Sequence, residues 1–223
     1  MHLDRADRVE LAAEGVLFGG QPVVVESESD QHYLTAMKNY LVRRGLFRPT
    51  RDIVFLPAAH LSGARTLVDL VAVSNEPLPF AILDANAGGR QFALGLKDGL
   101  YAADQSRVLT VADFREIVDG EVEDLLPLSL LARVVDRFFT RPGGVDEDFE
   151  TVAKEGLAFL PQVEDYARRN KILLEPAWKV DFAKRVKLTL LRATGDPLRG
   201  EPEYVNLWRR LFDTIHPTEV SPA

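Results

Sequence analysis

Strand-like and helix-like segments alternate over residues 1–125, and this alternation limits the fold more than any other feature of the sequence. Residues 21–26 contain a run of three valines between a Gly-Gly pair and a polar cluster, which is typical of a buried strand. Residues 52–57 and 80–84 have the same apolar character, and a helix-like segment follows each of the three runs. The alternation predicts an α/β fold, in which a parallel sheet carries helices on both faces.

Local signals mark the other elements of this region. Capping side chains predict a helix over residues 27–44, and further helices are expected to begin at Ser62 and at Arg90. Residues 107–111 and 121–125 predict two more short extended segments.

The pattern changes after residue 127, where only helix-like segments remain. These predicted helices cover residues 128–139, 146–159, 162–170, 176–192 and 202–212, with proline and glycine between them. The sequence therefore predicts an α/β domain over 1–127, followed by a small all-helical region over 128–223 that packs against it. A short charged helix is also expected near the start, over residues 3–14.

Composition excludes several classes of protein. The 223 residues include no cysteine, which excludes disulfides, thiolate catalysis and cysteine-ligated zinc, and the four histidines are scattered without a zinc-binding spacing. No segment has the spacing of a P-loop or of a dinucleotide fingerprint. The apolar runs are too short to cross a bilayer and the first residues lack a signal-peptide pattern, so we expect a cytoplasmic protein without a membrane partner.

Charge is distributed unevenly along the chain. The formal net charge is −7, yet residues 165–192 carry eight basic and three acidic side chains. A basic segment beside an acidic body suits a protein that holds cations in one place and phosphates in another. The alternative is that these charges are solvated faces of surface helices.

Oxygen-bearing side chains follow the predicted strands at the points where they end. They are Glu26 and Asp30 after the first strand, Asp84 and Asn86 after the third, and Glu121 and Glu123 in the last extended segment. Ligands bind beyond the carboxyl ends of open parallel sheets, so these side chains are expected to converge there. Crowded carboxylates repel each other unless cations neutralise them, and oxygen ligands favour Mg²⁺ or Mn²⁺.

Each of these acids also has a purely structural interpretation. Asp30 could cap a helix, Asp84 could belong to a turn with the glycines that follow it, and Glu121 and Glu123 could form a solvent-exposed face. Three acidic strand ends in succession favour the metal site over these separate explanations.

Four segments in this order resemble the Toprim domain of primases, topoisomerases and certain nucleases. They are Val-Val-Glu-Ser-Glu-Ser-Asp at 24–30, Pro-Ala-Ala-His-Leu-Ser-Gly at 57–63, Ile-Leu-Asp-Ala-Asn-Ala-Gly-Gly-Arg at 82–90 and Glu-Val-Glu-Asp-Leu-Leu-Pro at 121–127. The last segment resembles most closely the overcoming-lysogenization-defect (OLD) family of nucleases. The resemblance covers residues 22–127, and extends only loosely to the helical tail.

The resemblance implies a Toprim-like parallel sheet and a site that binds two Mg²⁺ or Mn²⁺ ions. It assigns Glu26 and Asp30 to metal binding and water activation, and places Asp84 on the first acid of the Toprim Asp-x-Asp pair. Asn86 stands where the second acid is expected, so the second ion would bind more weakly or depend on Glu121 and Glu123. Ser27 is a second departure, since it replaces the usual glycine after the first glutamate, whereas Ser62 matches a small polar residue at the metal edge.

The family also uses a lysine of the helical tail to stabilise the transition state. Lys179 is the choice here, with Lys184 and Lys187 as alternatives, and each could instead be a surface charge.

The resemblance implies a metal-dependent DNA endonuclease or exonuclease. It further implies that DNA and an N-terminal ATPase domain are the partners, that this chain is the catalytic fragment of that larger protein, and that the fragment binds no ATP itself. Two alternatives stay open: a Toprim primase-like phosphotransferase, and a degenerate Toprim module that binds nucleic acid or a partner, which Asn86 and Ser27 would favour.

Overall fold

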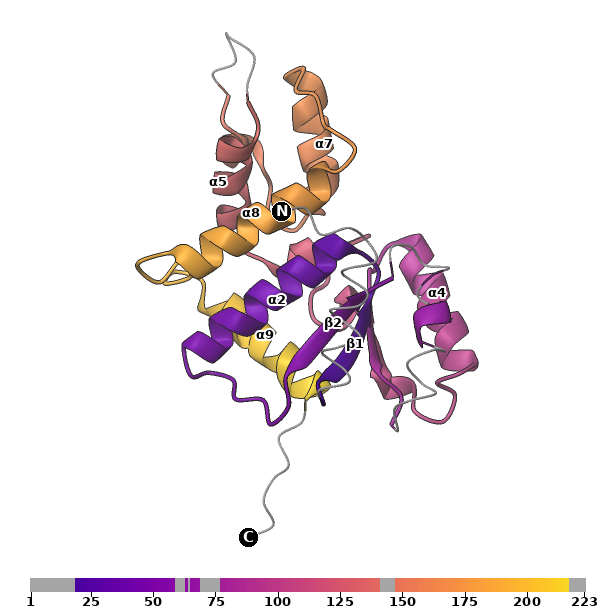
Figure 1. Ribbon diagram of the computed structural model, residues 1–223. Helices are drawn as coiled ribbons and strands as arrows, with labels where there is room; N and C mark the ends of the chain where they lie inside the picture. Colours follow the sequence, from indigo (N-terminus) through magenta and orange to yellow (C-terminus); the bar gives the residue numbers. More distant parts are fainter. Residues whose placement is uncertain (1–18, 59–62, 64, 69–76, 141–146, 217–223) are drawn as a thin grey trace.

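The protein has an α/β fold with a four-stranded parallel sheet, followed by a helical region (Figure 1). The computed structural model describes residues 19–58, 63, 65–68, 77–140 and 147–216. The strands are β1 (Gln21–Val25), β2 (Ile53–Pro57), β3 (Phe80–Leu83) and β4 (Val108–Thr110), in the spatial order β2-β1-β3-β4. All three strand pairings are parallel, as the sequence predicted.

Helices cover both faces of this sheet, which explains why three consecutive residues of β1 are apolar. Val23 and Val25 pack on the side of α2 (Glu28–Arg43), whereas Val24 packs on the side of α4 (Ala87–Asp98). Successive side chains of a strand point to opposite faces, so both faces of this part of β1 are apolar.

The helical region contains five helices within the described residues. They are α5 (Leu128–Phe138), α6 (Phe149–Val152), α7 (Phe159–Arg169), α8 (Trp178–Arg192) and α9 (Pro202–Ile215). The prediction of one helix over 146–159 is wrong, because α6 ends at Val152. Pro161 was expected to separate helices but lies in the first turn of α7, where a missing backbone N–H is tolerated.

Two predictions about extended or helical segments also need correction. Residues 121–125 were expected to be extended, but Val122–Leu125 form a 3₁₀ helix, η3. The Asp124 carboxylate accepts from the backbone N–H of Glu121 at 2.9 Å and from that of Phe159 at 2.8 Å, and these bonds curl the segment. The helix expected to begin at Arg90 begins three residues earlier.

Some expected elements lie partly or wholly outside the described residues. The helix predicted over 3–14 is outside them, as is Ser62. Gly63 and residues 65–68 are helical, in agreement with the helix predicted there.

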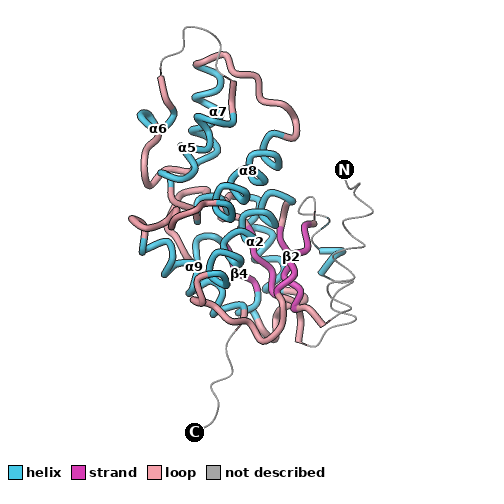
Figure 2. The backbone as a smooth tube through the Cα atoms, turned by 60° about the vertical axis from the view of Figure 1, so that its left-hand side comes forward, coloured by secondary structure: helices cyan, strands magenta, loops and turns pink. Residues whose placement is uncertain are grey.

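The helical region contributes to the same hydrophobic core as the sheet. Figure 2 shows α2 between α8 and β2, and α8 packs on α2 and α5. The α9 helix returns to the sheet: the Trp208 indole donates to the Leu125 carbonyl at 2.7 Å, and the Gln21 side chain at the start of β1 donates to the Ile215 carbonyl. Whether residues 1–127 form a domain of their own stays a prediction.

Candidate metal centre

The carboxyl ends of β1 and β3 bring Glu26 and Asp84 together. The two strands are neighbours, with Val25 paired to Ile82, so the residue after each strand lies at the same sheet edge. The backbone N–H of Asp84 donates to Oε1 of Glu26 at 2.8 Å. Asp84 is buried and Glu26 is half-buried. The sheet topology therefore produces the contact that the strand-end argument predicted.

Asp84 also draws the 3₁₀ helix η3 to this edge. Its Oδ1 accepts from the backbone N–H of Val122 at 3.2 Å, and the N–H of Ala85 donates to the Gly120 carbonyl at 2.8 Å. Glu121 and Glu123 belong to this η3 segment, so they approach the edge although they do not share a face of a strand.

Asp30 lies at the same edge and also caps a helix. Ser27 is the N-cap of α2, and Asp30 completes a capping box: Oδ2 accepts from the Ser27 N–H at 2.8 Å, while the Ser27 hydroxyl accepts from the Asp30 N–H at 3.2 Å. Oδ1 of Asp30 makes no hydrogen bond to any described residue. The capping role is therefore real, and it leaves one oxygen of a buried carboxyl for other chemistry.

Burial and mutual repulsion favour the protonated forms of these acids. The pKa of Asp84 is raised from 3.8 to about 11, first by burial and then by the charges of Asp30 and Glu26. Burial also raises the pKa of Asp30 to about 7, with Glu26 and Glu121 adding to the shift against the capping bonds that oppose it. The pKa of Glu26 is raised by burial and by Glu121, against the bond from Asp84.

Glu123 is as deeply buried as Asp30. Burial, followed by Glu121 and Asp124, raises the pKa of its carboxyl well above the ordinary value. Tyr33 of α2 is fully buried beside these acids, and burial together with the Glu123 charge raises the pKa of its phenol. We define the acidic edge as the five carboxyls that influence one another here: Glu26, Asp30, Asp84, Glu121 and Glu123.

No positive side chain neutralises the acidic edge within the described part of the chain. No described lysine, arginine or histidine forms an ion pair with any of its five members. The charge pattern and the oxygen chemistry fit a divalent cation. In the same part of the chain, however, no three Asp, Glu or His side chains converge closely enough to hold an ion as they stand. Carboxylates that repel each other turn apart in the absence of a cation, and a bound cation would draw them together.

Asn86 has a structural task that the sequence argument did not foresee. It is the N-cap of α4, and its Oδ1 accepts from the backbone N–H of Gly89 at 2.9 Å. The side chain is half-buried beside Asp84 in the chain, so its oxygen is already engaged while remaining at the correct edge.

The three candidate lysines of α8 differ in their contacts. Nζ of Lys184 lies 3.6 Å from Oε1 of Glu28, at the start of α2, and 3.4 Å from Oδ1 of Asp181. Lys187 is half-buried, and burial together with the charge of Lys38 lowers its pKa. Lys179 forms no ion pair with an acidic side chain of the described residues, so Lys184 is the candidate whose contact with the first turn of α2 is shown.

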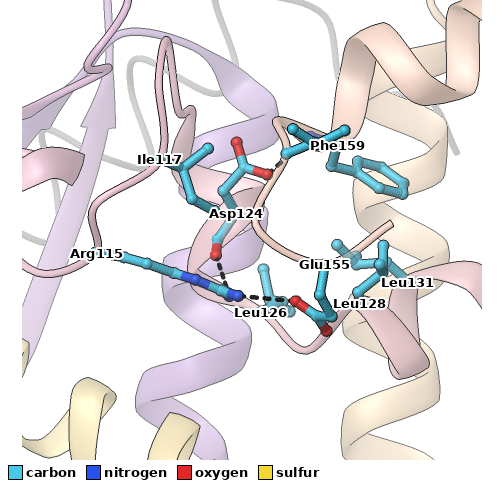
Figure 3. A pocket seen from close by; sticks show the side chains of 9 residues that line it. Arg115, Ile117, Asp124, Leu126, Leu128, Leu131, Glu155 and Phe159 are labelled. Atoms are coloured by element: carbon cyan, nitrogen blue, oxygen red, sulfur yellow. Dashed lines mark hydrogen bonds and ion pairs between the residues drawn. The ribbon is translucent and has the colours of Figure 1, made fainter. Parts of the chain in front are cut away.

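A small pocket lies on the far side of Asp124 (Figure 3). Arg115 crosses it, donating to the Asp124 carbonyl at 2.8 Å and to the Glu155 carboxylate at 3.0 Å. Burial raises the pKa of Asp124 to about 6, although its two backbone hydrogen bonds oppose the shift. The space holds about one water molecule. Asp124 and Arg115 therefore fasten η3 to the helical region and do not form a substrate cavity.

Sequence reasoning missed two residues of the site. Tyr33 was seen only as part of an apolar helix face, and no sequence signal distinguishes it from the other core residues of α2. Gly89 was taken as turn chemistry, yet it is buried in the first turn of α4 against Glu26 and Asp84. A glycine just before a predicted helix, five residues after a strand-end acid, was a usable signal of close approach.

Comparisons with protein-family models, with curated proteins and with solved structures found no match to this chain. None of the helices within the described ranges combines the length and apolar character needed to cross a membrane. The candidate site is therefore judged on its own geometry and charge.

Proposed function

We propose that the protein is a Toprim-type, metal-dependent DNA nuclease that hydrolyses phosphodiester bonds. The observation that carries the proposal is the acidic edge, where buried carboxyls from β1, β3 and η3 meet at the carboxyl end of a parallel sheet without a described basic partner. Such an arrangement destabilises the metal-free fold, and divalent cations would remove the repulsion.

The proposed metal ligands form two groups. Glu26 and Asp84 would hold the first Mg²⁺ or Mn²⁺ ion, and Asn86, Glu121 and Glu123 would contribute to a second. Two such ions, when bound, activate a water and stabilise the leaving oxygen.

Asp30 is the candidate proton acceptor. Its Oδ2 is fixed by the Ser27 N–H, whereas Oδ1 is open to receive a proton from the attacking water. Burial raises the pKa of this carboxyl in the metal-free protein, and cations bound beside it would lower the pKa again, which favours the carboxylate form that accepts a proton.

The basic face of α8 would contact the DNA backbone. Lys184 is favoured over Lys179 and Lys187 as the side chain that stabilises the added negative charge, because it reaches Glu28 at the start of α2. The expected ATPase partner rests on the family resemblance alone, and the expected cytoplasmic location rests on the sequence composition.

Nicking of supercoiled plasmid tests the proposal directly. The wild-type protein is incubated with plasmid in Mg²⁺, in Mn²⁺ and in excess chelator, and the Asp84→Asn variant is the matched control. Nicked or linear product that requires the cation and Asp84 supports the nuclease. Cleavage that persists in chelator, or equal cleavage by the variant, would overturn it.

A second candidate is a Toprim-like module that binds nucleic acid or a partner without cutting. It is favoured by Asn86, which serves as a helix cap, and by the absence of a preformed ligand shell among the described residues. DNA binding that is independent of Mg²⁺, without cleavage, would favour this candidate. A primase-like phosphotransferase, the remaining alternative, would instead extend primers with nucleotides.

A further inference from the structure

Gly89 lies where there is no room for a Cβ atom, although its backbone conformation is one that other residues can adopt. It lies in the first turn of α4 and is buried. A Cβ atom there would lie 2.2 Å from the carbonyl oxygen of Asp84 and 2.9 Å from Oε1 of Glu26. Contacts below 3 Å are not tolerated by packed atoms, so any side chain would push one of these groups away.

The group most exposed to such a push is the Glu26 carboxylate. Its Oε1 accepts the 2.8 Å bond from the Asp84 N–H and is also the side-chain atom nearest to the missing Cβ. The Asp84 carbonyl belongs to the backbone at the end of β3 and cannot rotate out of the way. Gly89 therefore restricts where Glu26 and Asp84 can lie relative to each other.

We infer that Gly89 is a positioning residue, whose bare Cα lets the first turn of α4 close against Glu26 and Asp84 and fix their separation for cation binding. The inference rests on the proposed function, since it treats the two acids as metal ligands. Groups that orient metal ligands act without touching the ion, and their loss weakens binding.

Gly95 supplies a matched control in the same helix. It is exposed, and a Cβ atom there would meet nothing within 4 Å. Alanine is a better helix former than glycine, so Gly95→Ala should leave the site unchanged and favour α4. The same chemical change at Gly89 differs only in what the added methyl group meets.

The first measurement is the affinity for Mn²⁺. The free ion is detected by electron paramagnetic resonance, at a temperature well below that of unfolding. Gly89→Ala should raise the dissociation constant by roughly 10-fold or more, whereas Gly95→Ala should leave it unchanged. If Gly89→Ala only lowers the unfolding temperature and the folded variant binds Mn²⁺ as well as the wild type, the positioning role is wrong.

A second measurement does not depend on the ion. The unfolding free energies of Gly89→Ala, Glu26→Ala and the double variant are compared in chelator. Because the two side chains compete for the same space, the double variant should be less destabilised than the sum of the single changes, whereas Gly95→Ala with Glu26→Ala should be additive. Additivity at Gly89 would contradict the contact.

A third measurement covers the case in which Gly89→Ala does not fold. In the wild-type protein, the amide resonances of Gly89 and Asp84 should shift together as Mg²⁺ is added, while that of Gly95 stays still. A wild-type protein that binds no cation would overturn the proposed function, and the free-energy comparison would then still decide the contact. Cation binding that leaves the Gly89 amide unmoved would overturn the inference alone.

Discussion

Polar groups at the two ends of the sheet differ in whether they have partners among the described residues. At the amino end, the buried Lys38 ammonium donates to Asp52 at 2.6 Å and to the Ile53 carbonyl at 2.9 Å. The nearby His216 ring accepts from the Thr50 N–H at 2.9 Å through Nε2 and faces the Gln21 side-chain oxygen at 2.5 Å through Nδ1. At the carboxyl end, the five carboxyls of the acidic edge have no described basic partner.

This difference separates stability from function. The amino end joins α2, the start of β2 and the end of α9 with satisfied hydrogen bonds, and each such bond contributes to stability. The carboxyl end holds charges that favour unfolding of the metal-free protein. Proteins retain destabilising groups where activity requires them, so the unbalanced end is where we expect the chemistry.

Removing either central acid is expected to have the largest effect. Glu26→Ala and Asp84→Ala should each lower plasmid cleavage by roughly 1,000-fold or more, because each removes a proposed ligand to the ions. The same variants should unfold in chelator at an equal or higher temperature than the wild type, since repulsion is relieved. Asp98→Ala, at the exposed far end of α4, should change neither property. Near-normal cleavage by Glu26→Ala would mean that the site is misplaced.

The lysines of α8 are expected to differ by role. Removal of the lysine that stabilises the transition state should lower the cleavage rate by roughly 100-fold with little change in DNA affinity. A lysine that only binds phosphate should instead weaken binding and flatten its salt dependence. We expect Lys184→Ala to show the first pattern and Lys179→Ala the second, as measured by single-turnover cleavage and by DNA titration at several salt concentrations. If Lys179, Lys184 and Lys187 all affect affinity alone, α8 is only a binding face.

The two ends should also respond to pH in opposite directions. The pKa of Asp30 rises from 3.8 to about 7 on folding, so between these values the folded protein holds a proton that the unfolded chain releases. The contribution of Asp30 to the free energy of unfolding therefore falls as pH rises from about 4 to 7. Asp84, with a pKa of about 11, continues this decline at higher pH. Burial, aided by the Arg51 charge, lowers the pKa of His216 below 6.5, so its contribution is lost as pH falls below 6.5.

Denaturant unfolding in chelator from pH 4 to 9 tests this opposition. The alkaline decline should amount to about 2 kcal/mol or more and should become shallower in Asp84→Asn. The acidic loss should become shallower in His216→Gln, which cannot titrate. A decline at alkaline pH that is the same in Asp84→Asn would show that the acidic edge is not its source.

The position of the strands along the chain and their parallel direction were predictable from local sequence, whereas their spatial order was not predicted. Val23, Val24 and Val25 are apolar without interruption because both faces of β1 are covered, and this is visible in the sequence alone. Residues 121–125 were mispredicted because their conformation depends on the bond from Phe159 to Asp124, thirty-five positions along the chain. Short-range patterns do not contain a contact of that range.

The candidate site likewise combines features that were predictable from the sequence with features that were not. The approach of Glu26 to Asp84 was predictable, since neighbouring parallel strands end at one edge. The capping bond of Asn86 is local, but it was missed because the start of α4 was predicted three residues too late. The close approach of Gly89 was not predictable, because it depends on the angle at which α4 leaves the sheet. The position of Lys184 depends on the packing of α8 on α2, which no spacing within α8 determines.

Asn86→Asp is expected to have the smallest effect, and it tests whether the capping residue of α4 can also serve the ions. Aspartate caps a helix as well as asparagine does, so the bond to the Gly89 N–H should survive. The added charge should tighten Mg²⁺ binding by a few-fold, because a carboxylate replaces an amide beside the proposed ligand Asp84. It should also lower the unfolding temperature in chelator, since it adds a sixth acid to an edge that already repels itself. Calorimetric titration with Mg²⁺ and thermal unfolding in chelator measure the two effects.

Asn86→Ala is the control: it should lose the cap, at a cost of about 1 kcal/mol, without gaining affinity for Mg²⁺. If Asn86→Asp changes neither Mg²⁺ affinity nor metal-free stability, the side chain serves α4 alone and the second ion depends on Glu121 and Glu123.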